Sequence, residues 1–325
     1  MKYLKTDLYL LIFIAFICGP ASAGGLIAVS IPPLKNVVED IAGDAFDVDL
    51  LISETESPHH ANLKPTGVRS ANNADMIIWL GASYETGMVK LIRSLPETKP
   101  VLGLLSHKAI AVLPHRQLHS VSEDSEHSGA KGDDHSERYE GHEEEGADDN
   151  EYEHGLIDPH IWLSPHTMIE VVNVIARELG TLEPSEAVTF RQNARALSER
   201  IEALELRMRE ALEPVRHVQF MVYYDALQYF EHSFGLTGGQ AVTLNPVKDI
   251  GSVSVAATRS RMNDQNIACF FAEPQFGDKV LQKYLPNRDT EIYRIDPVGN
   301  TDWFDLMETL VAGLVDCLGK PEVAA

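Results

Sequence analysis

Long apolar runs are missing from this 325-residue chain beyond its N-terminus, so no later segment is suited to crossing a bilayer. The N-terminal run, over residues 8–17, is itself too short for a membrane span. Two lysines precede this run and Ala21-Ser22-Ala23 follows it, which is the pattern of a secretory signal peptide. We therefore assign residues 1–23 to a signal peptide, cleaved after Ala23, and expect an exported protein.

Cysteine is also scarce, with three residues in the whole chain. Cys18 falls in the signal peptide, and the large residue Ile17 directly before it fits a lipid-anchored start poorly. The mature chain keeps Cys269 and Cys317. Two cysteines in an exported chain suit one disulfide, and the alternative is a pair of buried thiols.

Basic residues are outnumbered, because 27 lysines and arginines face 49 aspartates and glutamates and leave a net charge of −22. Nucleic acid is therefore not expected as a partner. Much of the negative charge is concentrated between Glu123 and Glu153, where fourteen carboxylates face only two basic residues.

The stretch 115–154 combines this acidity with six of the thirteen histidines of the chain. They are His115, His119, His127, His135, His142 and His154. With almost no apolar residues to bury, the stretch is expected to be a disordered loop. Imidazole binds zinc, copper and nickel, and carboxylates raise the local cation concentration, so we interpret the loop as a weak collector of transition metals. The alternative is a solvated acidic linker whose histidines are incidental.

Short apolar runs alternate with helical patterns on both sides of this loop. Strands are expected over 26–31, 48–52, 76–80, 101–105, 218–223, 241–244, 268–271 and 292–295. Helices are expected over 34–42, 65–72, 86–95, 226–234, 253–263, 278–284 and 303–317, with another beginning near residue 165. Nearly continuous apolar strands of this kind are typical of parallel sheets that helices cover on both faces.

The longest periodic stretch runs from about residue 185 to 212, between Pro184 and Pro214. At 1.5 Å per residue a helix of that length spans roughly 40 Å. The predicted fold class is α/β: two lobes with small parallel sheets, joined by one long backbone helix. The corresponding boundaries are 24–183 for the N-terminal lobe, 184–213 for the connecting helix and 214–325 for the C-terminal lobe.

Potential metal ligands follow several predicted strands, at the ends where ligands gather in such sheets. The group comprises His59 and His60, His160 in Asp158-Pro159-His160, Tyr224 and Asp225, Glu273, and Asp296. A cleft between the lobes could bring them together, and two imidazoles with one carboxylate suit zinc or manganese. Each also has a plainer interpretation: a solvated loop or core histidine, a turn-opening aspartate before proline, or a structural hydrogen-bond acceptor.

Six segments carry a resemblance to a known family. They are Ser57-Pro58-His59 with Leu63-Lys64-Pro65, the run 74–81, the run 158–165, Tyr224-Asp225-Ala226 with Tyr229-Phe230, the run 271–276, and Asp296-Pro297-Val298-Gly299. Together they resemble the zinc and manganese solute-binding proteins of bacterial ABC uptake systems, most of all the ZnuA-type periplasmic zinc-binding proteins. A His-rich loop before the Asp-Pro-His motif is typical of the zinc branch.

The resemblance implies a periplasmic, non-enzymatic receptor that binds Zn²⁺ between its lobes and delivers it to an ABC permease. We expect a monomer. The implied ligands are His59, His160 and Asp296, and the implied disulfide joins Cys269 to Cys317. Manganese or iron is the alternative cargo.

One position departs from the family pattern, because Tyr224 stands where zinc members carry histidine and many manganese members carry glutamate. Neutral phenol is a poor zinc ligand. Three sets of ligands are compatible with this departure. In the first, water completes a set of His59, His160 and Asp296; in the second, His60 or a loop histidine supplies the missing ligand; in the third, Tyr224 binds as phenolate, which would favour ferric iron.

Two other functional classes fit the sequence less well. In a secreted zinc hydrolase Glu273 would be the candidate base, but the chain has no metalloprotease helix motif. In an adhesin or a metal-storage protein, surface attachment would be expected.

Overall fold

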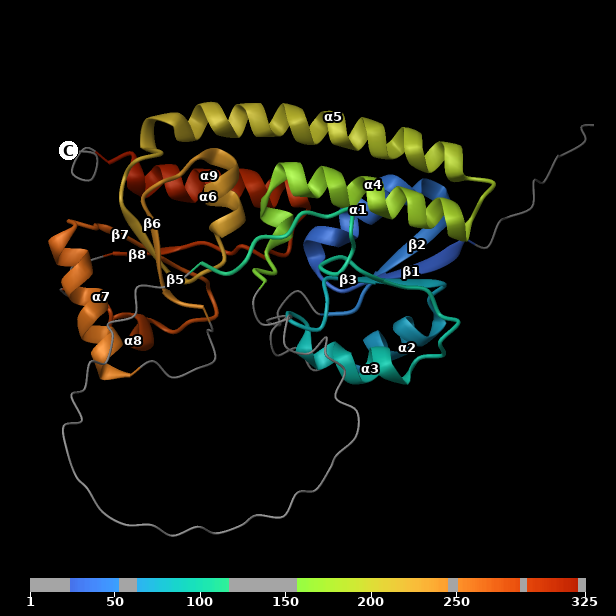
Figure 1. Ribbon diagram of the computed structural model, residues 1–325, viewed down its shortest axis with the longest axis horizontal. Coiled ribbons are helices and arrows are strands. Elements are labelled where there is room, and N and C mark those ends of the chain that lie inside the picture. The colour runs from blue at the N-terminus through green and yellow to red at the C-terminus, as the bar shows by residue number, and fades with distance from the viewer. Residues whose placement is uncertain (1–23, 53–62, 117–156, 245–250, 287–290, 321–325) are drawn as a thin grey trace, which may run out of the picture.

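The structure, a computed structural model, describes residues 24–52, 63–116, 157–244, 251–286 and 291–320. It consists of two α/β lobes side by side, each built on a four-stranded sheet in which all strands are parallel (Figure 1). The predicted fold class is therefore confirmed. His59, His60 and the histidines at 119, 127, 135, 142 and 154 lie outside the described residues.

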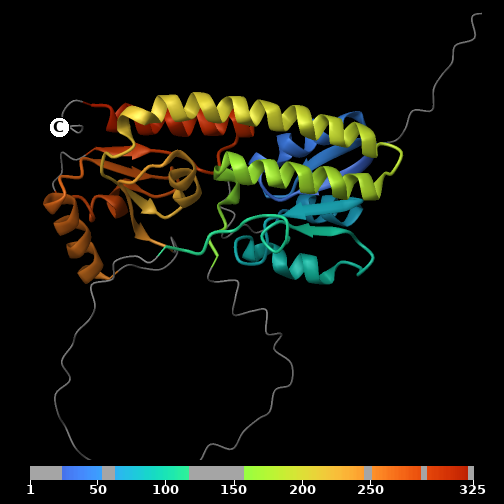
Figure 2. The same cartoon turned by 45° about the horizontal axis from the view of Figure 1, so that its top comes forward.

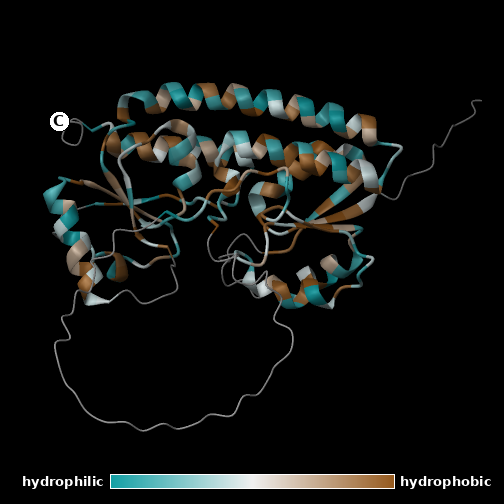
Figure 3. Ribbon diagram, viewed as in Figure 1, coloured by the Kyte–Doolittle hydropathy of each residue, from teal (hydrophilic) through white to brown (hydrophobic). Residues whose placement is uncertain are grey.

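The N-terminal lobe has the strand order β2-β1-β3-β4. Its strands are β1 (Gly25–Val29), β2 (Phe46–Leu50), β3 (Met76–Trp79) and β4 (Val101–Gly103), and its helices are α1 (Pro32–Ala42), α2 (Pro65–Asn73), α3 (Val89–Ser94) and α4 (Pro165–Leu182). All four residues of β3 are buried, as expected for a strand covered on both faces. Figure 3 shows that the strands of this sheet are largely hydrophobic. Helix α4 begins where Ser164 caps it, accepting a hydrogen bond from Thr167 N at 3.2 Å, with Pro165 in the first turn.

The C-terminal lobe repeats this arrangement with the order β6-β5-β7-β8. Its strands are β5 (Phe220–Tyr224), β6 (Gly239–Thr243), β7 (Cys269–Ala272) and β8 (Ile292–Arg294), and its helices are α6 (Gln228–Phe234), α7 (Ser252–Asp264), α8 (Asp278–Leu281) and α9 (Trp303–Leu318). The predicted elements agree with these bounds to within a few residues. The helix expected over 86–95 is a short 3₁₀ turn, Thr86–Met88, followed by α3, and the helix expected over 278–284 ends at Leu281.

Helix α5 (Ala187–Leu212) lies across both lobes, as the sequence predicts (Figure 2). Its buried residues recur every three or four positions: Phe190, Ala194, Leu197, Ile201, Leu204, Met208 and Leu212. This stripe packs on α4 and α1 of the first lobe and on α9 and α6 of the second. One continuous helix of about 39 Å thus holds both lobes.

The indole of Trp162 adds a second connection between the lobes. Its Nε1–H donates to the carbonyl of Pro297 at 2.7 Å, and the backbone carbonyl of Trp162 accepts from Trp303 Nε1 at 2.7 Å. Both indoles are buried, so these bonds are shielded from water.

In the described part of the chain no helix is both long and apolar enough to span a membrane.

A disulfide joins Cys269, the first residue of β7, to Cys317 near the end of α9, with the Cα atoms 6.0 Å apart. The predicted disulfide is confirmed. Both cysteines are buried, so the bond ties the central region of the second sheet to the helix that covers it.

Replacing both cysteines by alanine should lower the free energy of unfolding by about 2–4 kcal/mol, because the disulfide restricts a loop of intermediate length in the unfolded chain. Urea unfolding of the oxidised protein and the double variant measures the difference. Equal midpoints would contradict the expected stabilisation, and the reduced wild-type protein provides the matched control.

Candidate metal site

Three neighbouring strands of the C-terminal lobe end in polar side chains. Tyr224 is the last residue of β5 and Asp225 follows it, Glu273 follows β7, and Asp296 lies two residues after β8. Because β5, β7 and β8 are adjacent and parallel, their carboxyl ends meet at one edge of the sheet. The structure therefore places these candidate ligands along one edge of the second sheet.

His160 faces this edge from the segment that precedes α4. The residue is 1% exposed, and its Nδ1 lies 2.7 Å from Asp158 Oδ1, which also accepts from the His160 backbone N at 3.0 Å. A carboxylate at this distance holds the proton on Nδ1 and places the lone pair on Nε2. The ring is thus oriented to offer Nε2 to a cation.

Aromatic rings from both lobes surround this imidazole. The centroid of the His160 ring lies 5.5 Å from that of Tyr84, which follows β3 of the first lobe, and 5.3 Å from that of Tyr224 in the second. The ring of Trp162 packs beside it at 5.2 Å. His160 therefore lies where the two lobes face each other.

Burial controls the ionisation of the groups around His160. It raises the pKa of Glu273 to about 8, with a further contribution from the charge of Asp296, while Arg294 acts in the opposite direction. Burial also raises the pKa values of Tyr84 and Tyr224 well above that of an ordinary phenol. Both tyrosines are therefore neutral at neutral pH, and Glu273 retains a proton until a cation compensates its charge.

Asp296 differs from Glu273 because it is exposed. Its Oδ1 accepts from the backbone N–H groups of Val298 at 3.1 Å and Gly299 at 2.8 Å. Gly299 has φ +64°, a conformation that favours glycine. This turn fixes the carboxylate at the edge of the sheet with Oδ2 directed away from both bonds, so the turn-opening role is compatible with a second role as ligand.

Residues 113–116, which we call the strap, cross from the first lobe to the second. Leu113 N donates to Tyr229 Oη at 2.7 Å. The side-chain amide of Gln228 donates to Pro114 O at 2.8 Å and accepts from Arg116 N at 3.0 Å. The strap also pairs with the segment before His160 through an antiparallel bridge between Pro114 and Ile157.

Arg116 anchors the end of the strap to the second lobe. Its guanidinium donates to both oxygens of Glu231, at 2.8 and 3.0 Å, and its Nη2 lies 2.8 Å from Asp225 Oδ1. Burial raises the pKa of Asp225 to about 7 although the charge of Arg116 lowers it. His115 and Arg116, which the sequence suggested as the start of a disordered loop, are thus packed residues of the strap.

In the described part of the chain, no three His, Cys, Asp or Glu side chains converge closely enough to hold a metal by themselves. Of the six histidines in the stretch 115–154, His115 alone lies in the described part of the chain. Two site residues were missed by sequence reasoning: Tyr84, because an isolated tyrosine after a strand has no distinctive pattern, and Arg116, a lone arginine whose partners lie more than a hundred residues away.

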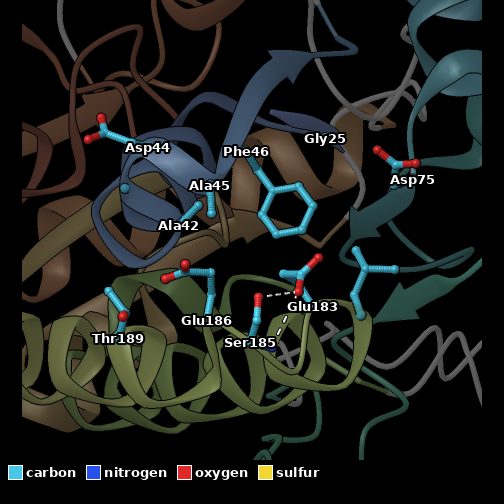
Figure 4. Close-up of a pocket in the computed structure, with 12 residues that line it drawn as sticks. Gly25, Ala42, Asp44, Ala45, Phe46, Asp75, Glu183, Ser185, Glu186 and Thr189 are labelled. Atoms are coloured by element: carbon cyan, nitrogen blue, oxygen red, sulfur yellow. Dashed lines mark hydrogen bonds between the residues drawn. The ribbon is translucent and has the colours of Figure 1, made fainter. Parts of the chain in front are cut away.

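A cavity of about 660 Å³ lies elsewhere, between the amino ends of β1 and β2 and the turn from α4 to α5 (Figure 4). Its acidic lining residues are Asp44, Asp75, Glu183 and Glu186. Asp75 already accepts from Leu26 N at 2.8 Å, and Glu183 accepts from Ser185. This cavity lies at the amino ends of strands of the first sheet, whereas His160 and its neighbours lie at the carboxyl ends of strands. We therefore take the carboxyl ends, and not this cavity, as the candidate metal site.

Comparison with known proteins gives consistent results. The family described as "Zinc-uptake complex component A periplasmic" matches residues 27–317. The "High-affinity zinc uptake system protein ZnuA" of Brucella suis is 29% identical over 98% of this chain and 100% of its own length, and that of Yersinia pestis is 28% identical over 86% and 84%.

Solved structures share the fold. A crystal structure of ZnuA superposes with a TM-score of 0.71 at 19% identity, over 90% of this chain and 98% of that one. An Mn-bound periplasmic metal binding protein from Candidatus Liberibacter asiaticus gives 0.66 at 19% identity, over 90% and 99%. At these identities the likeness establishes the two-lobe architecture alone.

We expect Glu273→Gln to make the stability of the metal-free protein depend less on pH. The folded state holds the Glu273 proton up to about pH 8, whereas an unfolded glutamate loses it near pH 4. Stability from this group is therefore complete below about pH 4 and is lost as the pH rises to about 8. Urea midpoints at pH 5, 6.5 and 8 should fall less in the variant, and parallel curves for both proteins would contradict the burial effect.

Proposed function

Because the chain belongs to the family of periplasmic A components of zinc-uptake complexes, we propose that it is a periplasmic receptor that binds Zn²⁺ between its lobes and delivers it to an ABC permease. The observation that carries this proposal is the buried His160, oriented by Asp158 and set between Tyr84 and Tyr224 from opposite lobes. Relatives named as zinc-uptake proteins over nearly the whole chain support zinc as the cargo.

The proposed ligands are His160 through Nε2, Asp296 through Oδ2, and His59 from the segment after β2. His160 and Asp296 are held in register because Trp162, two residues after His160, donates to Pro297, directly after Asp296. Two imidazoles and a carboxylate leave one position of a tetrahedron for water, His60 or a loop histidine. Histidine ligands favour zinc over manganese, which prefers oxygen donors.

Tyr224 is the least suitable of the alternative ligands. Its burial and the nearby charges of Asp158 and Glu273 favour the neutral phenol, which has little affinity for zinc. Phenolate would be the form that favours ferric iron, so the surroundings of Tyr224 argue for zinc over iron. We propose that the ring of Tyr224 packs beside His160 and does not bind the ion.

Carboxylates at the same edge supply a negative potential for the cation. Glu273 is buried and its Oε2 has no hydrogen-bond partner among the described residues. A divalent cation nearby would favour its ionised form, so binding should release protons near neutral pH. The acidic loop 115–154, for which we propose a role in collecting metal, would raise the local cation concentration further.

His160→Ala should abolish tight binding of one zinc per chain. We suggest testing the full mature chain with His119, His127, His135, His142 and His154 changed to asparagine, which removes competing loop ligands. Competition with a chromophoric chelator should show a loss larger than the roughly 100-fold typical of a lost supporting partner.

The matched control is His166→Ala, because this histidine is exposed on α4 near the same segment. It should bind zinc as the parent does. Retention of one tight zinc by His160→Ala would refute the receptor site, and stimulation of the cognate permease ATPase by the loaded parent alone tests delivery.

Tyr224→His should tighten zinc binding by at least about tenfold, equivalent to about 1.4 kcal/mol, because it adds an imidazole at a position whose tyrosine ring lies 5.3 Å from the ring of His160. The same chelator competition measures the change, and Tyr224→Phe is the control, since it removes the hydroxyl without adding a ligand. Equal affinities for the histidine and phenylalanine variants would show that position 224 does not face the ion.

A further inference from the structure

Several buried polar atoms near His160 have no hydrogen-bond partner in the described part of the chain, and Asp158 Oδ2 and His115 Nδ1 are among them. Buried carboxylate oxygens and ring nitrogens are nearly always paired, because leaving them unpaired in a dry environment is costly. The other oxygen of Asp158 already accepts two bonds from His160. The carboxylate is therefore secured on one side only.

The backbone places His115 and Asp158 on the same face of a short ladder. The antiparallel bridge joins Pro114 to Ile157, and Asp158 N donates to Leu113 O at 2.9 Å. Side chains alternate between faces, so the neighbours of Pro114 and Ile157 share the face opposite to that pair. Residues 115 and 158 are diagonal neighbours there, within reach of long side chains.

The charges around His115 agree with this placement. Its imidazole interacts electrostatically with Asp158 and, next, with His160, while its partial burial lowers its pKa and keeps it neutral. The adjacent cation, Arg116, is engaged by Glu231 and Asp225 on the second lobe. With its proton on Nδ1, the neutral imidazole of His115 is a donor that the ladder places beside the unpaired oxygen of Asp158.

We propose that His115 is a positioning residue for the metal ligand His160, with its Nδ1–H donating to Asp158 Oδ2 in the zinc-loaded protein. One buried carboxylate would then be held by an imidazole at each oxygen, and the plane of the His160 ring would be fixed with it. This inference rests on the proposed zinc-receptor function. It separates His115 from the other loop histidines, to which we assign only weak metal collection.

The test uses the full mature chain with the five other loop histidines changed to asparagine, as above. His115→Leu removes the donor, and zinc affinity should fall by roughly 10- to 100-fold, as for loss of other partners that orient a metal ligand. His115→Asn places an amide N–H near the position of Nδ1 and should restore most of the affinity. His115→Gln places its amide farther out, near Nε2, and should restore less.

Cobalt(II) absorption distinguishes positioning from ligation, because its visible bands depend on the ligands that bind the ion. All three His115 variants should give the parent spectrum at saturating cobalt. A changed spectrum with no rescue by asparagine would mean that His115 binds the ion itself, which overturns the proposal. Leucine and asparagine variants of equal affinity would overturn it as well.

His166→Leu, an exposed change on α4, is the control and should leave affinity unchanged. Should the leucine variant fail to fold, the asparagine and glutamine variants still decide the question, since equal affinities for them would contradict the donor geometry. His160→Ala belongs in the same series. If it keeps tight zinc, the receptor function fails, whereas loss in His160→Ala with no effect at position 115 defeats the positioning role alone.

Discussion

The indole of Trp162 sets the relative position of the lobes in this protein. It is buried between them and donates to the carbonyl of Pro297, while the backbone carbonyl of Trp162 accepts from the indole of Trp303. Its ring also packs against Tyr84 and His160. The same residue therefore links the segment of His160 in the first lobe to the segment of Asp296 in the second.

The second constraint is electrostatic. Acidic side chains are gathered at the carboxyl edge of the second sheet, where burial makes their ionised forms costly. Asp225 is compensated by Arg116, which also fastens the strap. Glu273 has weaker compensation, because the guanidinium of Arg294 bonds its backbone carbonyl and not its carboxylate. A site with an incompletely compensated negative group favours a cation over an anion or a neutral ligand.

Much of this architecture could be read from the sequence, because it depends on local patterns. Strands such as β3 and β7 are short and wholly apolar, which predicts parallel sheets, and the three- and four-residue spacing along α5 predicts a long one-sided helix. The gathering of Tyr224, Glu273 and Asp296 followed from the rule for strand ends.

The strap and the surroundings of His160 could not be predicted in this way. Arg116 pairs with Asp225 and Glu231, and Leu113 with Tyr229, across more than a hundred residues. No spacing in the chain encodes such pairs, since they depend on how the lobes are placed. The composition of the stretch that begins at His115 favoured disorder, but two fixed partners in the second lobe outweigh that tendency for its first two residues.

Helix α5 runs unbroken over both lobes, so it restricts hinge motion between them. Its outline should be almost the same with and without a bound ion. Under the proposed delivery to an ABC permease, the loaded and the empty protein would differ mainly at the carboxyl ends of the strands, and these ends are where the permease would distinguish them.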